Sequence, residues 1–125
     1  MTDVTPLIPA GRQVIESYGR NGFHVSGTGY EGAIIVFPDV TLRWVVADLA
    51  SITLDNLTPA FGRGVEIMLL GCGRRMGAPL SFELRAALKR EGIVIDAMDT
   101  GAACRTYNIL LAEERRICAA LLPAR

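Results

Sequence analysis

Two short segments of the chain combine glycine with arginine, a pairing that lets the backbone approach an anion while a guanidinium binds it. One segment follows the apolar run at 65–70, and the other follows the apolar run at 93–95. A helix that begins near the second segment would add unpaired N–H groups and a partial positive charge. The pattern therefore predicts a pocket for a small anionic molecule between the two segments. Its candidate binding residues are Gly71, Gly73, Arg74, Arg75, Thr100, Gly101, Arg105 and Asn108.

The same residues also fit a structural role, and the sequence leaves both interpretations open. Thr100 could be the N-cap of the helix, with Arg105 paired to Asp96 or Asp99. Asn108 could satisfy backbone groups in the loop of the first segment. Under this interpretation the second segment holds the fold together and binds nothing.

The residues that could do chemistry do not form a known catalytic pattern. Gly71, Gly73 and Gly77 depart from the dinucleotide fingerprint because the third glycine comes one position late. His24 is the single histidine, and no partner stands at ligand spacing, so neither a metal site nor a Cys–His relay is predicted. Cys104 is the one candidate nucleophile, although a small buried cysteine is the favoured interpretation. We expect no catalytic residue, no metal and no cofactor.

Composition excludes several further classes of function. The chain has 125 residues, with 13 basic and 13 acidic side chains, so it lacks the positive charge typical of nucleic-acid binding. Its apolar runs are shorter than the roughly 20 residues of a membrane helix, so we expect no membrane insertion. Three cysteines without CxxC spacing argue against a disulfide framework. The first residues resemble neither a secretory signal nor an Arg-rich transit sequence, and a cytoplasmic protein is expected.

The first half of the chain predicts a flexible arm followed by strands. Residues 1–12 contain two prolines and a glycine and are expected to form the arm, while residues 13–125 form a single domain. Short apolar runs between 13 and 46 are separated by turn residues, which predicts an antiparallel β-meander. Between 53 and 64, Asp55 or Thr58 could cap a short helix.

The second half predicts strands that alternate with helices, as in an α/β fold. The runs at 65–70 and 93–98 are nearly all apolar, which is typical of parallel strands covered on both faces. Ser81 is expected to cap the helix between them, with Gly92 as its stop. A second helix from Thr100 is expected to lead to a final strand at 117–122. In such sheets, ligands bind where the strand ends meet the following loops.

The string TGAACRTYN at 100–108, together with the looser GCGRRM at 71–76, resembles a family of small single-domain proteins of unknown function. The family includes the mitochondrial complex I assembly factor 3 and an adipogenesis-associated protein, and the similarity runs from about Ile15 to Leu122. The resemblance implies a three-layer α/β fold: a central mixed sheet with a mainly parallel core, packed helices and an additional β-rich element. The resemblance implies no settled enzymatic activity. It does imply that the mitochondrial relatives assist the assembly of complex I through contacts with other proteins. Without a transit sequence, a bacterial member is expected.

Two classes of function therefore stand side by side. We expect a non-catalytic binding or assembly protein that acts through contacts with other proteins. The alternative is an enzyme or ligand-binding protein that uses the pocket between the 71–77 and 100–105 loops. A third possibility is that strand edges left by the meander pair between subunits, so that the working unit is a homo-oligomer.

Overall fold

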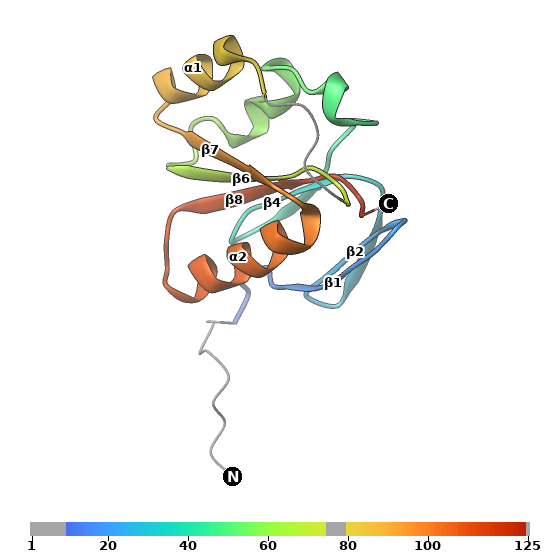
Figure 1. Ribbon diagram of the computed structural model, residues 1–125. Helices are drawn as coiled ribbons and strands as arrows, with labels where there is room; N and C mark the ends of the chain where they lie inside the picture. The colour runs from blue at the N-terminus through green and yellow to red at the C-terminus, as the bar shows by residue number, and fades with distance from the viewer. Residues whose placement is uncertain (1–9, 75–79, 125) are drawn as a thin grey trace.

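The computed structural model describes residues 10–74 and 80–124 and arranges them in three layers (Figure 1). The middle layer is a five-stranded mixed sheet with the strand order β5-β4-β8-β6-β7. Its strands are β4 (Ile34–Val36), β5 (Thr41–Arg43), β6 (Ile67–Gly71), β7 (Val94–Met98) and β8 (Ile117–Leu121). The predicted three-layer α/β fold is confirmed.

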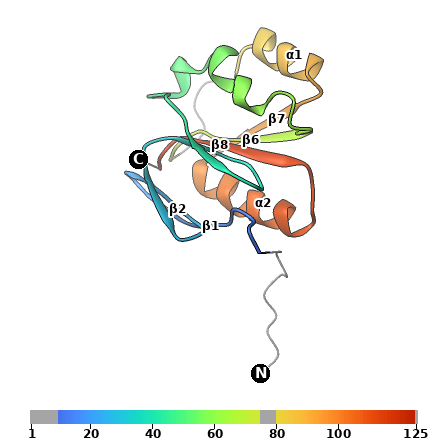
Figure 2. The ribbon, with the colours of Figure 1, turned by 180° about the vertical axis from the view of Figure 1, so that it is seen from behind.

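The outer layers cover the two faces of this sheet, as the front and rear views agree (Figures 1 and 2). On one face lie α1 and two short 3-10 helices, and on the other lie α2 and a three-stranded antiparallel sheet. The bounds of these elements are α1 (Phe82–Arg90), η1 (Leu49–Ser51), η2 (Asp55–Ala60), α2 (Thr100–Ala112), β1 (Ile15–Tyr18), β2 (Gly22–Val25) and β3 (Thr28–Glu31).

The inner strands β4, β6 and β8 are apolar on both sides because each side faces a covering layer. The edge strand β7 exposes Val94 and Asp96, so the expectation of two covered faces was wrong for the run at 93–98. In β6, Met68 and Leu70 belong to the core beneath α1, whereas Leu69 belongs to the core beneath α2. In β8, Ala119 and Ala120 take the same alternating positions and are completely buried. The two-residue repeat of a strand thus builds a separate apolar core on each face.

The connections of β6 and β7 place their carboxyl ends at one edge. β6 pairs in parallel with β7 and also with β8, so it lies between them. After β6 the chain goes to α1 on one face, and after β7 it goes to α2 on the other. This edge is therefore a topological switch point, the place where open α/β sheets usually bind ligands. The expectation that the two apolar runs lie side by side and parallel is confirmed.

Three local details refine the expectations. The 13–46 region does not form one meander: β1, β2 and β3 form the small sheet, while β4 and β5 join the central sheet. The physical reason is that β4 is fully buried and needs a covering layer on each face. Residues 55–60 form a 3-10 helix without a side-chain cap, so the capping roles of Asp55 and Thr58 were wrong. Ser81 does cap α1, and its Oγ accepts a hydrogen bond from the Leu84 N–H at 3.1 Å.

Candidate functional site

The loops after β6 and β7 meet directly at the switch point. The Cys72 N–H donates to the Met98 carbonyl at 2.8 Å, and the Thr100 N–H donates to the Gly73 carbonyl at 2.8 Å. The segment after β8 also reaches this edge, because the Leu122 N–H donates to the Gly71 carbonyl at 3.0 Å. Three chain segments therefore share one rim and are joined to each other by backbone hydrogen bonds.

Thr100 ties these three segments together from within. Its side chain is completely buried, and its hydroxyl donates to the Leu122 carbonyl at 2.6 Å while accepting from the Gly73 N–H at 2.8 Å. The N-cap of α2 is Asp99, whose Oδ1 accepts from the Ala102 N–H at 2.9 Å. The structural alternative that made Thr100 the cap was therefore wrong, because its hydroxyl turns inward to the strand ends.

Tyr18, at the end of β1, covers the start of α2. A Cβ added at Gly101 would lie 2.6 Å from the Tyr18 hydroxyl oxygen, so glycine is what allows this close approach. The Arg105 Nη1 donates to the same hydroxyl at 3.1 Å. The suggested pairing of Arg105 with Asp96 or Asp99 is absent from the ion pairs of the described residues. Tyr18 was not among the predicted site residues. No strand was predicted at 15–18, because only one of its residues is buried and the segment carries little apolar pattern.

Tyr107 and Asn108 attach the first strand to α2. The Asn108 Oδ1 accepts from the Ile15 N–H at 3.0 Å, and its Nδ2 donates to the Ile15 carbonyl at 2.8 Å. The amide thus binds one residue of β1 as a neighbouring strand would. The Tyr107 hydroxyl donates to the Gln13 carbonyl at 2.8 Å, and the rest of that side chain is buried in the core. Asn108 therefore does not reach the loop after Gly71, because α2 directs it toward β1.

The remaining predicted residues divide between packing and a small cavity. A Cβ at Gly71 would lie 2.9 Å from the Leu121 side chain and 3.0 Å from the Thr100 hydroxyl, so Gly71 permits close packing of α2 on β6. Gly73 and Arg74 line a cavity of about 180 Å³ at this edge. The other lining residues are Ala47, Asp48, Leu49, Cys72, Leu122 and Pro123. Arg75 lies outside the described residues. The anion pocket between these loops stays a prediction.

Burial makes Cys104 a poor nucleophile. The side chain is 2 % exposed, and desolvation raises the pKa of its thiol to about 12, which the nearby Arg105 only partly offsets. Burial likewise raises the pKa of Cys118 to about 12. Cys72 packs against the core beneath α1, whereas Cys104 lies in the core on the other face of the sheet. The expectation of a small buried cysteine at 104 is confirmed.

Two further features bear on the class of site. His24 is exposed on β2. Across residues 10–74 and 80–124, no three His, Cys, Asp or Glu side chains are grouped so that they could hold a metal ion. Within the same ranges, every helix is too short or too polar to span a bilayer.

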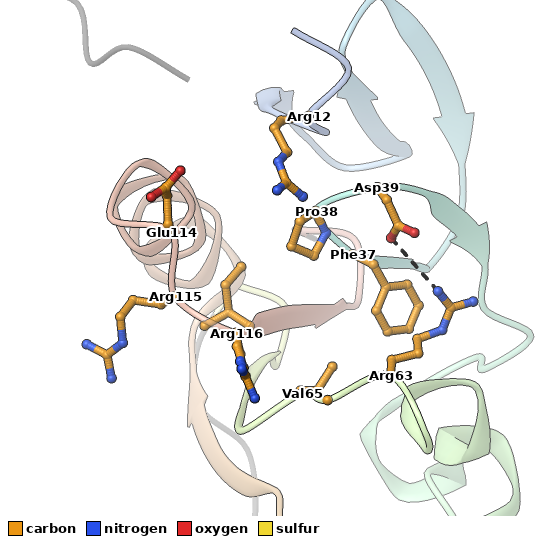
Figure 3. A pocket seen from close by; sticks show the side chains of 11 residues that line it. Arg12, Phe37, Pro38, Asp39, Arg63, Val65, Glu114, Arg115 and Arg116 are labelled. Carbon is orange, nitrogen blue, oxygen red and sulfur yellow. Dashed lines mark ion pairs between the residues drawn. The ribbon is translucent and has the colours of Figure 1, made fainter. Parts of the chain in front are cut away.

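A second, larger cavity lies at the opposite edge of the central sheet, where β6 and β8 begin (Figure 3). Its volume is about 410 Å³, within the range of small-ligand sites. Its charged lining consists of Arg12, Asp39, Arg63, Glu114, Arg115 and Arg116. No signal in the sequence indicated this cavity, because its arginines come from three separate connecting segments and the pair at 115–116 resembles an ordinary solvated helix end.

Known proteins share both the sequence and the fold of this chain. A complex I assembly factor 3 of Danio rerio (named NADH dehydrogenase [ubiquinone] 1 alpha subcomplex assembly factor 3) is 35% identical over 112 residues, covering 88% of this chain. The chain spans 64% of the length of that relative. A crystal structure of a Bordetella parapertussis protein superposes with a TM-score of 0.83 at 38% identity, covering 92% of this chain and 99% of that one.

A second solved structure and a family model agree with these likenesses. The solution structure of a Bordetella pertussis protein, described as a Mth938-like domain, superposes with a TM-score of 0.82 at 30% identity and covers 98% of this chain and 92% of its own. The model of a family described as "Protein of unknown function (DUF498/DUF598)" matches residues 15–122, which include every element from β1 to β8. The chain belongs to this family.

Proposed function

We propose that this protein is a non-catalytic binding protein that assists the assembly of respiratory complex I through contacts with other proteins. One observation carries the proposal: three polar side chains of the 100–108 string are bonded within the fold, while Arg105 lies exposed at its surface. Thr100, Tyr107 and Asn108 bind backbone groups of other segments, and Arg105 binds Tyr18. The 100–108 string is thus a structural clamp.

This arrangement argues against the enzyme alternative at the same place. A catalytic side chain needs a lone pair or proton that a substrate can reach. The hydroxyl of Thr100 has both a donor and an acceptor within the fold, and the thiol of Cys104 is buried with a raised pKa. Function then belongs to the exposed surface, as it does in a protein that holds partners together.

The name of the Danio rerio relative supports the choice of partner class. Because this chain spans 64% of that relative, the proposal carries over only a contact role for the shared domain. Exposed aromatic side chains commonly anchor such contacts. Phe82, which is 79% exposed at the start of α1, is the candidate anchor on this surface.

Affinity capture from the native host tests the proposal. The tagged full chain should recover subunits of NADH dehydrogenase, identified by mass spectrometry, and a deletion strain should accumulate partial complexes on a blue-native gel. Phe82→Ser should reduce recovery at least fivefold while the fold is retained, and the neighbouring exposed Glu83→Ser should not. A deletion strain with normal complex I and no recovered subunits would contradict the assembly role.

The small-anion alternative rests on one observation, a 180 Å³ cavity lined by Gly73 and Arg74, although Asp48 also lines it and the described 100–105 loop does not. Its test is a sulfate titration followed by thermal unfolding of the protein. A saturable rise in melting temperature that disappears in Arg74→Gln supports the alternative, and an unchanged melting temperature removes it.

A further inference from the structure

The cavity at the start of β6 and β8 has an apolar floor and a basic rim. Phe37, Pro38, Val65 and Ile117 provide the floor, and three of them are less than a tenth exposed. These residues come from the segment directly after β4, the segment before β6 and the first position of β8. Figure 3 shows Arg12, Arg63 and Arg116 around this floor, whereas the Arg115 side chain points away from it. The floor offers apolar contact, and the rim offers charge.

Arg63 is held in a fixed orientation at this rim. Its guanidinium lies over the Phe37 ring, with Cζ 4.2 Å from the ring centre, and its Nε donates to the Pro59 carbonyl at 2.8 Å. The Asp39 carboxylate lies 3.9 Å from Nη1, which is longer than a hydrogen bond. The cation is thus stacked and oriented, while its terminal nitrogens are not bonded to that carboxylate.

The other arginines concentrate positive charge at the same place. The Arg116 Nη1 is 3.7 Å from Glu66, in an exposed pair that solvent screens strongly. Arg12 and Arg115 complete the set. With four arginines against two carboxylates, the lining carries a formal charge of +2, whereas the whole chain carries +0. Four of the 13 basic side chains of a protein with no net charge therefore line one cavity.

The surroundings distinguish between the anions that arginine binds. Phosphate sites typically use backbone N–H groups at a helix N-terminus. Here the adjoining helix end is the C-terminus of α2, where Glu114 and Arg115 line the cavity, and that end carries a partial negative charge. Two acidic side chains at the rim further disfavour a dianion. A carboxylate carries a single negative charge, so it meets less of this repulsion than a dianion does and still matches the planar guanidinium.

We propose that this cavity is a binding site for a carboxylate joined to an apolar body. The carboxylate pairs with Arg63 and its neighbours, and the apolar body lies against Pro38 and Val65. A free organic acid and an acidic residue of a protein segment both supply this chemistry. The site lies at the sheet edge opposite the 71–77 and 100–105 loops, so it stands or falls independently of complex I assembly.

An NMR titration of the ¹⁵N-labelled full chain tests the site. The probe is 3-phenylpropionate, and its alcohol, 3-phenylpropanol, has the same body without the carboxylate. The acid should produce saturable shifts at the amides of Phe37, Val65 and Ile117, whereas the alcohol and inorganic phosphate should not. Saturable shifts of equal size with the alcohol would overturn the proposal. So would the absence of shifts with both the acid and the peptide acetyl-Leu-Glu-Leu-amide.

Arginine variants and a peptide complete the test. Arg12→Gln/Arg116→Gln leaves the stacked Arg63 in place and should weaken binding at least tenfold, whereas the exposed Arg90→Gln on α1 should not change it. Equal affinity in the double variant would overturn the role of the arginine rim. Tighter binding of acetyl-Leu-Glu-Leu-amide than of 3-phenylpropionate supports a carboxylate supplied by a protein, and the reverse order supports a free acid.

Discussion

Replacing Thr100 by valine removes one hydroxyl and nearly conserves the shape of the side chain. In the native protein that hydroxyl bonds to Leu122 and Gly73 in a completely buried position. Valine leaves a carbonyl and an N–H without partners, at a cost of about 1–3 kcal/mol each. We therefore expect the free energy of unfolding to fall by about 2–6 kcal/mol, a large share of the 5–15 kcal/mol typical of a domain.

Urea unfolding followed by the fluorescence of Trp44 measures this loss. Trp44 is the single tryptophan and is 5% exposed, so its emission reports exposure of the core. The midpoint should fall while the slope of the transition stays constant, which shows that stability and not compactness has changed. Hydrogen exchange should accelerate at the Gly73 amide in particular, because it loses its acceptor.

Two control variants make the interpretation specific. Thr100→Ser keeps both hydrogen bonds and loses one methyl group, so it should cost about 1 kcal/mol. Thr58→Val removes an exposed hydroxyl that bonds to the Asp55 carbonyl, and water replaces that bond at little cost. A loss below about 1 kcal/mol in Thr100→Val, or an equal loss in Thr58→Val, would refute the clamp at the switch point.

Three further predictions concern Asn108, Glu114 and the buried thiols. Asn108→Leu removes both bonds to Ile15 and should lower the unfolding free energy by about 2–3 kcal/mol, with faster hydrogen exchange at the Ile15 amide; unchanged exchange there contradicts it. Glu114 has a φ of 58°, so Glu114→Gly should raise the unfolding free energy by about 0.5–1 kcal/mol in urea, and a decrease contradicts it. Burial raises the pKa of Cys104 and Cys118 from 9.0 to about 12. Above pH 9 the folded state therefore keeps thiol protons that the unfolded state loses. The free energy of unfolding should then fall by about 1 kcal/mol per pH unit for each thiol. Urea unfolding at pH 8–11 measures this slope, which should flatten in the Cys104→Ala variant.

The sequence predicted secondary structure best where a periodic apolar pattern coincides with burial. The apolar runs at 65–70 and 93–98 and the final run at 117–122 became neighbouring strands of the central sheet. Ser81 capped its helix as expected because a cap depends on residues within one turn. The small sheet was harder, since β1 and β3 are short and mostly exposed and so carry little apolar pattern.

The roles of the polar residues could not be predicted from the sequence. The partners of Thr100 and Asn108 lie 22 to 93 positions away along the chain, at Leu122, Gly73 and Ile15. No local pattern encodes contacts of that separation. The arginine-lined cavity could not be predicted for the same reason, because its cations come together only when β4, β6 and β8 are paired.

By itself, the sequence determined that the runs at 65–70, 93–98 and 117–122 are strands that alternate with helices, and that two glycine-containing loops leave the same edge. Those properties depend on neighbours within a few residues and on the repeat of apolar side chains. Only the tertiary structure decided that the 100–108 string is a clamp and that the open basic cavity lies at the opposite edge. Both depend on which distant groups satisfy each other, because a buried hydroxyl or amide bonds to whatever polar atoms the packing brings within about 3 Å.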